Sequence, residues 1–365
     1  MSGRKKRVAV GLSGGVDSAV TAHILKEKGF DVCGITMSIW DGGITIDDLT
    51  KKGCYGPNKD KDIEDARKIS EFLNIPFKVI DMKKEFQEHV VSYFKKEYLA
   101  GRTPNPCVVC NRFLKFGAFL EKALSEGFEF DYFATGHYAR IVEENGEFFI
   151  KKAVYESKDQ TYFLQGIKRE LLKKILFPLG EMTKPQVREI ARKIGLEVAE
   201  RPESQDFIAG GDYSPLFAND NIKAGDIVDE TGKVLGRHKG IIHYTVGQRK
   251  GLGISSEKPL YVLKIDPEKN RVVVTDKENL FSDTLTAASF NPLVKFENIN
   301  EFRALAKIRQ KHKEAPATIS FIDPNTLNIV FDEPQLSITP GQAVAIYDGD
   351  KLLGGGIIEI SAVLK

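Results

Sequence analysis

The residues of this chain best suited to chemistry lie near its start, where residues 13–18 are Ser-Gly-Gly-Val-Asp-Ser. They follow the apolar run Val8–Leu12, which predicts a buried strand, and we expect a helix to begin at about Asp17. A strand–turn–helix junction directs free backbone amides and the positive end of a helix dipole at one small volume. The two glycines let the backbone approach a ligand without a Cβ in the way. The segment therefore predicts an anion-binding turn.

The form of this turn narrows the kind of anion. No Gly-Lys-Ser/Thr follows at the spacing of a Walker loop, and the third glycine of a dinucleotide fingerprint is missing. The pattern resembles the PP-loop of the ATP pyrophosphatases, which split ATP between the α- and β-phosphates and adenylate a substrate oxygen. An ordinary glycine-rich turn between a strand and a helix is the alternative interpretation.

Three of the four cysteines also call for a chemical explanation. Cys33 lies in an apolar run and is most simply a small core residue. Cys107 and Cys110 have the Cys-x-x-Cys spacing of a chelating or redox pair, and Cys54 lies in a long loop rich in Gly and Asp. Four cysteines in a chain of this size do not indicate a disulfide framework.

The elements that must position these residues alternate between strand and helix in the first part of the chain. Repeated βα units imply a parallel sheet covered on both faces, with ligands at the carboxyl ends of its strands. A loop is expected from Ser38 to about Lys61, another from Gly101 to Cys110, and a largely helical stretch from 147 to about 195. We expect strands at Val8–Leu12, Val32–Met37, Phe77–Ile80 and Tyr132–Thr135, and helices at 17–28, 62–74 and 84–100.

From about Gly211 the pattern changes to short β-rich runs separated by turn residues, which is typical of small barrels. We therefore expect an α/β ATP-binding domain over 1–210, a small β-rich central domain over 211–280 and a C-terminal β-barrel over 281–365.

The composition fits a soluble globular protein, with 42% hydrophobic and 28% charged residues. No apolar stretch approaches the length of a membrane span, and the basic start Arg4–Arg7 leads into a short strand rather than a signal-peptide core. We expect a cytoplasmic protein with no membrane partner. The net charge is only +2, but basic clusters such as Lys307–Lys313 either bind a nucleic acid or are ordinary solvated side chains.

Five further motifs follow one another along the chain. They are Thr-Pro-Asn-Pro-Cys-Val-Val-Cys-Asn at 103–111, Thr-Gly-His-Tyr at 135–138, Lys-Asp-Gln-Thr-Tyr-Phe-Leu at 158–164, His-Tyr-Thr-Val-Gly-Gln-Arg-Lys-Gly-Leu at 243–252 and three glycines at 354–356. Together with the PP-loop pattern, they resemble the tRNA-specific 2-thiouridylases of the MnmA (TrmU) family over nearly the whole chain.

The resemblance implies a PP-loop domain with a Rossmann-like parallel sheet, a small central domain and a C-terminal β-barrel. It also implies a reaction in which ATP, with Mg²⁺, adenylates O2 of the wobble uridine U34 in a tRNA anticodon stem-loop, and sulfur then displaces AMP. The residues implied to bind ATP are Gly11, Leu12, Ser13, Gly14, Gly15, Val16, Asp17, Ser18, Met37 and Gly136.

By the same resemblance, Cys110, Cys107 and Asp17 are catalytic, and a second set of residues contacts tRNA. Asn105, Pro106 and Cys107 are implied to meet the target base. The other implied tRNA contacts are Lys158, Asp159, Gln160, Arg309 and Gln310. Asp159 and Gln160 have an alternative interpretation as polar residues that cap a local turn.

The chain departs from the family pattern in its cysteines. The family has Asp at the position of Cys107, a catalytic Cys at that of Cys110, and a second catalytic Cys where this chain has Ile208. An isoleucine cannot carry a persulfide. Three thiolates, from Cys54, Cys107 and Cys110, would instead suit a [4Fe-4S] cluster with one open iron that binds hydrosulfide. A Cys107–Cys110 persulfide pair and a structural metal are the alternatives, and the sulfur donor is either sulfide or a sulfur-carrier protein.

Two other functions compete with thiolation. One is another PP-loop adenylating activity of the amidotransferase type, which would need an ammonia source that the sequence does not contain. The other is a tRNA-binding homologue that has lost catalysis, against which the intact loop at 13–18 argues.

Overall fold

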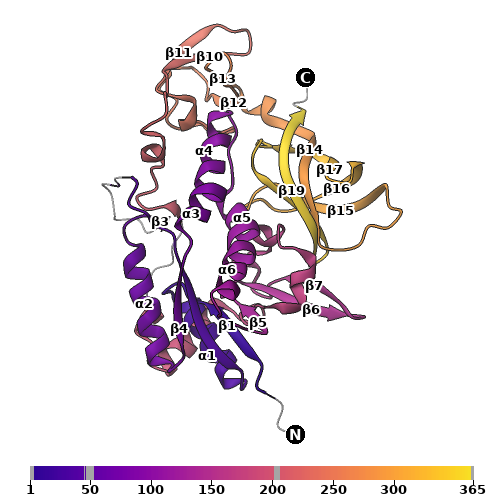
Figure 1. The fold of residues 1–365 in the computed structure, drawn as a ribbon. Helices are drawn as coiled ribbons and strands as arrows, with labels where there is room; N and C mark the ends of the chain where they lie inside the picture. The colour runs from indigo at the N-terminus through magenta and orange to yellow at the C-terminus, as the bar shows by residue number, and fades with distance from the viewer. Residues whose placement is uncertain (1–3, 45, 47–52, 201–205, 363–365) are drawn as a thin grey trace. The chain divides into compact units, whose positions relative to one another are not determined.

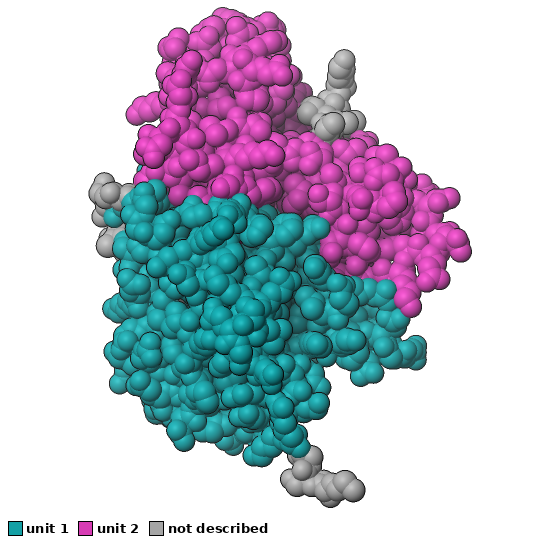
Figure 2. Space-filling model, viewed as in Figure 1, with its two compact units in different colours: residues 1–89, 109–212, 350–352 teal, residues 90–108, 213–349, 353–365 magenta. Residues whose placement is uncertain are grey.

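The protein is described by a computed structural model that covers residues 4–44, 46, 53–200 and 206–362. The chain divides into two compact units, which Figure 2 shows in teal and magenta. Unit 1 comprises residues 1–89, 109–212 and 350–352, and unit 2 comprises residues 90–108, 213–349 and 353–365. Among the described residues, no helix has the length and apolar character needed to cross a bilayer.

Unit 1 is built on a five-stranded sheet in the order β4-β2-β1-β5-β8. Figure 1 labels strands β4, β1 and β5 of this sheet. All four pairings are parallel, so the carboxyl ends of the strands lie along one edge. The predicted parallel α/β sheet is confirmed. Its strands are β1 (Arg7–Gly11), β2 (Asp31–Ser38), β4 (Phe77–Asp81), β5 (Tyr132–Ala134) and β8 (Ile175–Leu176).

Three helices share one hydrophobic core with this sheet, namely α1 (Val16–Glu27), α2 (Lys59–Phe72) and α7 (Lys184–Lys193). Val8 and Val10 of β1 belong to this core together with apolar side chains of all three helices. Helix α7 begins with a capping box between Thr183 and Gln186, which satisfies backbone donors at its first turn. The other α-helices among the described residues are α3 (Lys83–Phe86), α4 (Ser92–Leu99), α5 (Pro106–Val109) and α6 (Phe119–Ser125).

Three local expectations were wrong. The stretch expected as a loop up to Lys61 contains strand β3 (Gly53–Tyr55), which pairs in parallel with β9 (Asp206–Ile208). The loop expected up to Cys110 ends at Pro106, where a helical run begins that continues as π-helical turns over Cys110–Ala118. Proline suits the first turn of a helix because its missing N–H has no partner there in any case.

The third wrong expectation is the largely helical stretch up to residue 195. The hairpin of β6 (Ala139–Glu144) and β7 (Glu147–Lys152) is followed mainly by short 3₁₀ turns, and α7 is the only α-helix there. The 3₁₀ turns lie at Glu156–Lys158, Thr161–Leu164 and Arg169–Lys174.

Unit 2 contains two β-structures. Strands β10 (Gly225–Val228), β11 (Val234–His238), β12 (Tyr261–Asp266) and β13 (Arg271–Thr275) form one sheet in the order β11-β10-β13-β12. The second is a barrel of six strands closed by the pairing of β14 with β19, which confirms the predicted C-terminal barrel. Its strands are β14 (Phe281–Pro292), β15 (Glu301–Lys307), β16 (Ala315–Asp323), β17 (Thr326–Leu336), β18 (Ala343–Asp348) and β19 (Lys351–Ala362).

Candidate functional site

A cavity of about 280 Å³ lies in unit 1, where the anion-binding turn meets the carboxyl ends of the central strands. Its lining combines nucleotide-binding candidates with thiols and cations. The turn contributes Gly11, Leu12, Ser13, Asp17 and Ser18, the ends of β2 and β5 contribute Met37, Thr135, Gly136 and His137, and Cys54, Cys110, Lys59, Lys115 and Gln160 complete the polar part. This is the edge of a parallel sheet at which ligands are expected.

The geometry of the turn depends on its glycines. Gly14 has a φ of +75°, and a Cβ there would lie 2.7 Å from the carbonyl oxygen of Asp62. The backbone N–H of Ser13 donates to Ser18 Oγ at 3.2 Å, and that hydroxyl donates to the carbonyl of Gly15 at 3.0 Å. Helix α1 has no side-chain cap at Gly15, so its N-terminus remains suited to an anion.

Asp17 is held by two partners that the sequence did not reveal. Lys184 Nζ lies 2.8 Å from both Asp17 carboxylate oxygens, and the Tyr138 hydroxyl donates to Oδ1 at 2.9 Å. The Lys184 side chain is only 8% exposed. Tyr138 is part of the Thr-Gly-His-Tyr motif noted in the sequence. No motif indicated Lys184, which is the first residue of α7.

Gly136 packs directly on the start of α1. A Cβ at this position would lie 2.9 Å from the backbone of Asp17 and from the N–H nitrogen of Ser18. Beside it, Thr135 Oγ1 and His137 Nδ1 lie 2.7 Å apart, and burial holds the pKa of His137 well below its ordinary value. His137 is therefore neutral at physiological pH, and it packs on the rings of Phe116 and Phe177.

Two of the four cysteines face this cavity. Cys54 on β3 and Cys110 at the start of the π-helical turns both line it, and both belong to unit 1. Burial raises the pKa of Cys110, Lys115 and Lys59 oppose that rise, and the charge of Cys54 adds to it. Because the interaction between two charges weakens with distance, the effect of Cys54 on Cys110 agrees with two thiols that line one small cavity.

The other two cysteines are not among the residues that line this cavity. Cys33 is buried in β2, and Cys107 is an exposed residue of α5 in unit 2. In the part of the chain that the structure describes, no group of three or more His, Cys, Asp and Glu side chains is arranged to hold a metal ion. Ile208, which stands at the position of the second catalytic cysteine in the family pattern, is buried.

The predicted tRNA contacts fall into both units. In unit 1, Gln160 lines the cavity and accepts from the Tyr138 N–H at 2.9 Å. Asp159 is buried and accepts from the Ala153 N–H at 3.1 Å and the Thr161 hydroxyl at 2.6 Å. These bonds fit its alternative interpretation as a local capping residue. Lys158 is partly exposed in the same loop.

In unit 2, Asn105 Oδ1 accepts from the Val108 N–H at 3.3 Å and so caps the helix that Pro106 opens. Arg309 and Gln310 lie in the turn between β15 and β16 and are partly exposed.

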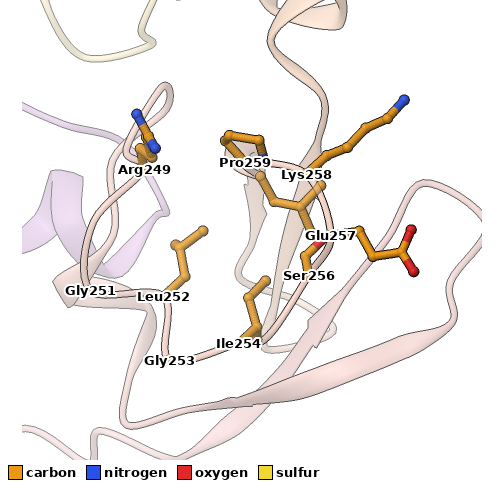
Figure 3. A pocket seen from close by; sticks show the side chains of 10 residues that line it. Arg249, Gly251, Leu252, Gly253, Ile254, Ser256, Glu257, Lys258 and Pro259 are labelled. Carbon is orange, nitrogen blue, oxygen red and sulfur yellow. The ribbon is translucent and has the colours of Figure 1, made fainter.

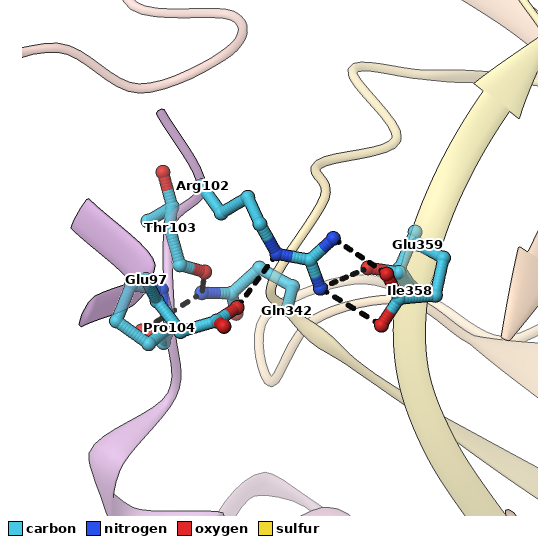
Figure 4. Close-up of polar contacts among 7 residues, drawn as sticks. All are labelled: Glu97, Arg102, Thr103, Pro104, Gln342, Ile358 and Glu359. Carbon is cyan, nitrogen blue, oxygen red and sulfur yellow. Dashed lines mark hydrogen bonds and ion pairs between the residues drawn. The ribbon is translucent and has the colours of Figure 1, made fainter. Parts of the chain in front are cut away.

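The segment leading to Asn105 is fixed by a polar network within unit 2 (Figure 4). Arg102 Nε donates to Glu97 at 2.7 Å, and its two terminal nitrogens donate to the Glu359 carboxylate at 2.7 and 3.0 Å. The Gln342 side chain donates to the Thr103 carbonyl at 2.9 Å. A fork of charge-assisted bonds therefore anchors this loop to strand β19.

A second cavity, of about 390 Å³, lies in unit 2 and is lined by residues of the segment 249–260 (Figure 3). Leu252 and Ile254 are among the side chains that line it, and its charged residues are Arg249, Glu257 and Lys258. The described residues that line it include no thiol and no histidine, so it offers no means for sulfur chemistry.

Fold and cavity together define a protein of the PP-loop class, with a glycine-containing turn at residues 13–18 between a strand and a helix of a parallel α/β sheet. Three family models match in succession: tRNA methyl transferase HUP domain over 6–209, tRNA methyl transferase PRC-barrel domain over 218–276 and aminomethyltransferase beta-barrel domain over 282–358. The chain belongs to the family of tRNA-specific 2-thiouridylases called MnmA.

The relatives that support this assignment match nearly end to end. The MnmA of Acetivibrio thermocellus is 47% identical over 97% of this chain and 99% of its own length. That of Carboxydothermus hydrogenoformans is 47% identical over 97% and 98%, and that of Clostridioides difficile 44% identical over 98% and 99%. Among solved structures, a 4-thiouridine synthetase–RNA complex with bound ATP gives a TM-score of 0.35 at 17% identity, over 55% of this chain and 44% of that chain.

Proposed function

We propose that this protein is an ATP-dependent tRNA-uridine 2-sulfurtransferase. It adenylates O2 of the wobble uridine U34, replaces that oxygen with sulfur, and releases AMP and pyrophosphate. The observation that carries the proposal is the unit 1 cavity, which joins the turn at residues 13–18 to the thiols of Cys54 and Cys110. We place the protein in the cytoplasm, where its tRNA substrate is found. We also propose that the chain has three domains, with boundaries at residues 210 and 280.

Adenylation is needed because a carbonyl oxygen is a poor leaving group until it carries AMP. The free amides at the start of α1 are suited to hold the phosphates of ATP, and the lining at Met37 and Gly136 is suited to its remaining part. Mg²⁺ bound with ATP would supply positive charge for the departing pyrophosphate, and Asp17, the carboxylate of the turn, would hold it through the acceptor sites left beside its bonds to Lys184 and Tyr138. Lys184 holds Asp17 in place for this role.

The target base is proposed to meet Asn105, Pro106 and Cys107, a segment that the Arg102 network fixes within unit 2. Lys158, Gln160, Arg309 and Gln310 are proposed to contact the anticodon stem-loop. Asp159 is proposed to act there through the loop that it holds, since both of its carboxylate oxygens bond within the chain.

The cysteines, as they are arranged in this structure, do not fit a [4Fe-4S] cluster. A [4Fe-4S] cluster on Cys54, Cys107 and Cys110 needs three converging thiolates, and the described residues contain no such group. Two thiols line the cavity, which suits a persulfide and a second thiol. No step of the proposed reaction therefore passes through a cluster. Iron and acid-labile sulfide analysis of protein purified without oxygen tests this point, and about four of each per chain would overturn it.

The proposed reaction is tested by incubating the full-length protein with ATP, a persulfide donor and a tRNA transcript with U34. We expect pyrophosphate and AMP only with tRNA, and 2-thiouridine at position 34 after nuclease digestion and mass spectrometry. A matched transcript with C34 should give none. Binding of tRNA without ATP cleavage would indicate a non-catalytic homologue, and ATP cleavage without tRNA would indicate a different adenylating enzyme. Either result would contradict the proposal.

A further inference from the structure

Two thiols line the cavity, and one of them lies on a strand paired with the position at which this chain departs from the family pattern. Position 208, where the family pattern has a second catalytic cysteine, lies on β9, and the strand paired with β9 is β3, which carries Cys54. Tyr55 and Ile208 are register partners, and both are buried. A thiol that is missing from one strand is thus present on the neighbouring strand.

The alternation of β3 directs Cys54 to the cavity. Successive side chains of a strand point to opposite faces, and Gly53 and Tyr55 are buried while Cys54 is exposed. The ring of Tyr55 stacks on Phe86, with 5.1 Å between centroids, and its hydroxyl donates to Asp41 at 2.8 Å. Because Tyr55 is fixed on the buried face, Cys54 is held on the opposite face, where it lines the cavity.

The two thiols differ in access. Cys54 is exposed and can be reached by a sulfur donor, whereas Cys110 is only partly exposed. Lys59 and Lys115 line the same cavity, and their positive charges favour anionic sulfur there. Exposure therefore assigns the receiving role to Cys54 and the second role to Cys110.

We propose that Cys54 and Cys110 are the working thiol pair of this cavity, with Cys54 carrying the transferred sulfur as a persulfide and Cys110 releasing it. This assignment rests on the proposed function, and it replaces both the Cys107–Cys110 pair and the missing thiol at position 208. Cys107 is left as an exposed residue of the segment that meets the base.

A persulfide donor transfers its outer sulfur to the Cys54 thiolate and leaves as a thiolate. The persulfide anion attacks C2 of the adenylated uridine, the C2–O2 bond breaks, and AMP leaves with O2. The Cys110 thiolate then attacks Cys54 Sγ, and the electron pair of the broken S–S bond leaves on the sulfur bound to C2. The 2-thiouridine regains at N3 the proton lost on adenylation.

This sequence leaves a Cys54–Cys110 disulfide, so each further cycle needs two electrons and two protons from an external dithiol. A single turnover without dithiol therefore captures the pair. We would incubate the full-length protein with ATP, U34 tRNA and glutathione persulfide, block free thiols with N-ethylmaleimide, and identify linked peptides by mass spectrometry. We expect a Cys54–Cys110 link in proportion to the 2-thiouridine formed.

Two variants sharpen the test. Cys54→Ser should lose at least about 100-fold in 2-thiouridine yield while it still releases pyrophosphate, which also shows that it folds. Cys33→Ala, a buried cysteine of β2 outside the cavity, should form the link and the product as the unmodified chain does. A Cys107–Cys110 link, or undiminished thiolation by Cys54→Ser, would overturn the pairing. Absence of tRNA-dependent pyrophosphate release in the unmodified chain would overturn the proposed function itself.

Discussion

At the scale of single residues, the pair of Lys184 and Asp17 shows what a local pattern could not reveal. Asp17 was predicted from the turn that contains it, because strand, glycines and helix start are adjacent in sequence. Lys184 stands 167 residues away and reaches Asp17 only because α7 packs against α1 in one core. A long-range ion pair of this kind leaves no spacing signal in a single sequence.

Replacing Lys184 by Met tests its role in positioning Asp17. The variant keeps an apolar stem but removes the cation, which leaves a partly buried carboxylate without its charge partner. We expect the free energy of unfolding to fall by about 1–3 kcal/mol and tRNA-dependent pyrophosphate release to fall at least about tenfold. Urea unfolding and a pyrophosphate assay measure the two effects.

The matched control for this variant is Lys193→Met, on the same helix, where a 71% exposed lysine pairs with Glu189. A surface pair of this kind contributes little, so we expect a change within about 0.5 kcal/mol and full activity. Equal effects in the two variants would refute a special role for Lys184.

The ionisation of Cys110 gives a prediction in pH. Burial raises the pKa of its thiol above the ordinary value, so the thiolate fraction should still be rising with pH where an ordinary thiol has levelled. We expect its alkylation by iodoacetamide, followed on the Cys110 peptide by mass spectrometry, to level off at a higher pH than the alkylation of glutathione does. A plateau below about pH 8 would mean that the site lowers the pKa of this thiol instead.

At the scale of elements, prediction succeeded where the determining residues are adjacent. The junction of β1 and α1 was predicted because apolar run, glycines and helix start are contiguous. Strand β3 was missed because it has only three residues, and its partner β9 lies far along the chain, at Asp206–Ile208. The sequence analysis grouped Cys54 with Cys107 and Cys110 at one site, but of these three only Cys54 and Cys110 line the cavity.

Gly14→Ala tests the backbone requirement of the turn. At a φ of +75° and with a Cβ 2.7 Å from the Asp62 carbonyl, alanine cannot be accommodated without moving the loop. We expect a loss of at least about tenfold in ATP affinity, measured by calorimetry. Gly29→Ala is the control, because Gly29 has a φ of +84° after the same helix, but a Cβ there would meet nothing within 4 Å. It should lose about 1 kcal/mol of stability and keep its ATP affinity.

Arg102→Ala tests the network that fixes the segment before Asn105. The change leaves Glu97 without the partner that bonds it at 2.7 Å, at a site where the arginine is 19% exposed. We expect a loss of about 2–4 kcal/mol in the free energy of unfolding of unit 2, followed by fluorescence or circular dichroism.

Arg303→Ala provides the comparison for Arg102, since Arg303 makes a similar forked contact to Asp332 but is 58% exposed. Its loss should cost no more than about 1 kcal/mol. If both variants lose the same amount, the Arg102 network is no more than a surface ion pair.

At the scale of the whole molecule, the sequence alone was enough to predict the fold class of each unit. Alternating strands and helices predicted the parallel sheet, and short β-rich runs predicted the barrel, because both patterns repeat over many residues. Binding of tRNA also concerns the whole molecule, because the net charge is only +2 and the basic residues that could contact tRNA are distributed over both units.

Binding of tRNA should therefore depend strongly on salt, because phosphate contacts release counterions. We expect affinity to fall at least about tenfold between about 50 and 200 mM salt, measured by fluorescence anisotropy. A Lys158→Ala and Arg309→Ala double variant should bind more weakly with a shallower salt dependence, whereas the exposed Lys264→Ala should not. Unchanged binding in the double variant would remove these two residues from the interface.

The central claim is that O2 of U34 leaves the tRNA on AMP. It is tested most directly with a tRNA whose U34 carries ¹⁸O at O2, incubated with the protein, ATP and a persulfide donor. We predict one ¹⁸O atom in the AMP for each 2-thiouridine formed, because the C2–O2 bond breaks only after O2 is joined to the α-phosphate. Recovery of unlabelled AMP together with ¹⁸O in water would contradict adenylation of the base.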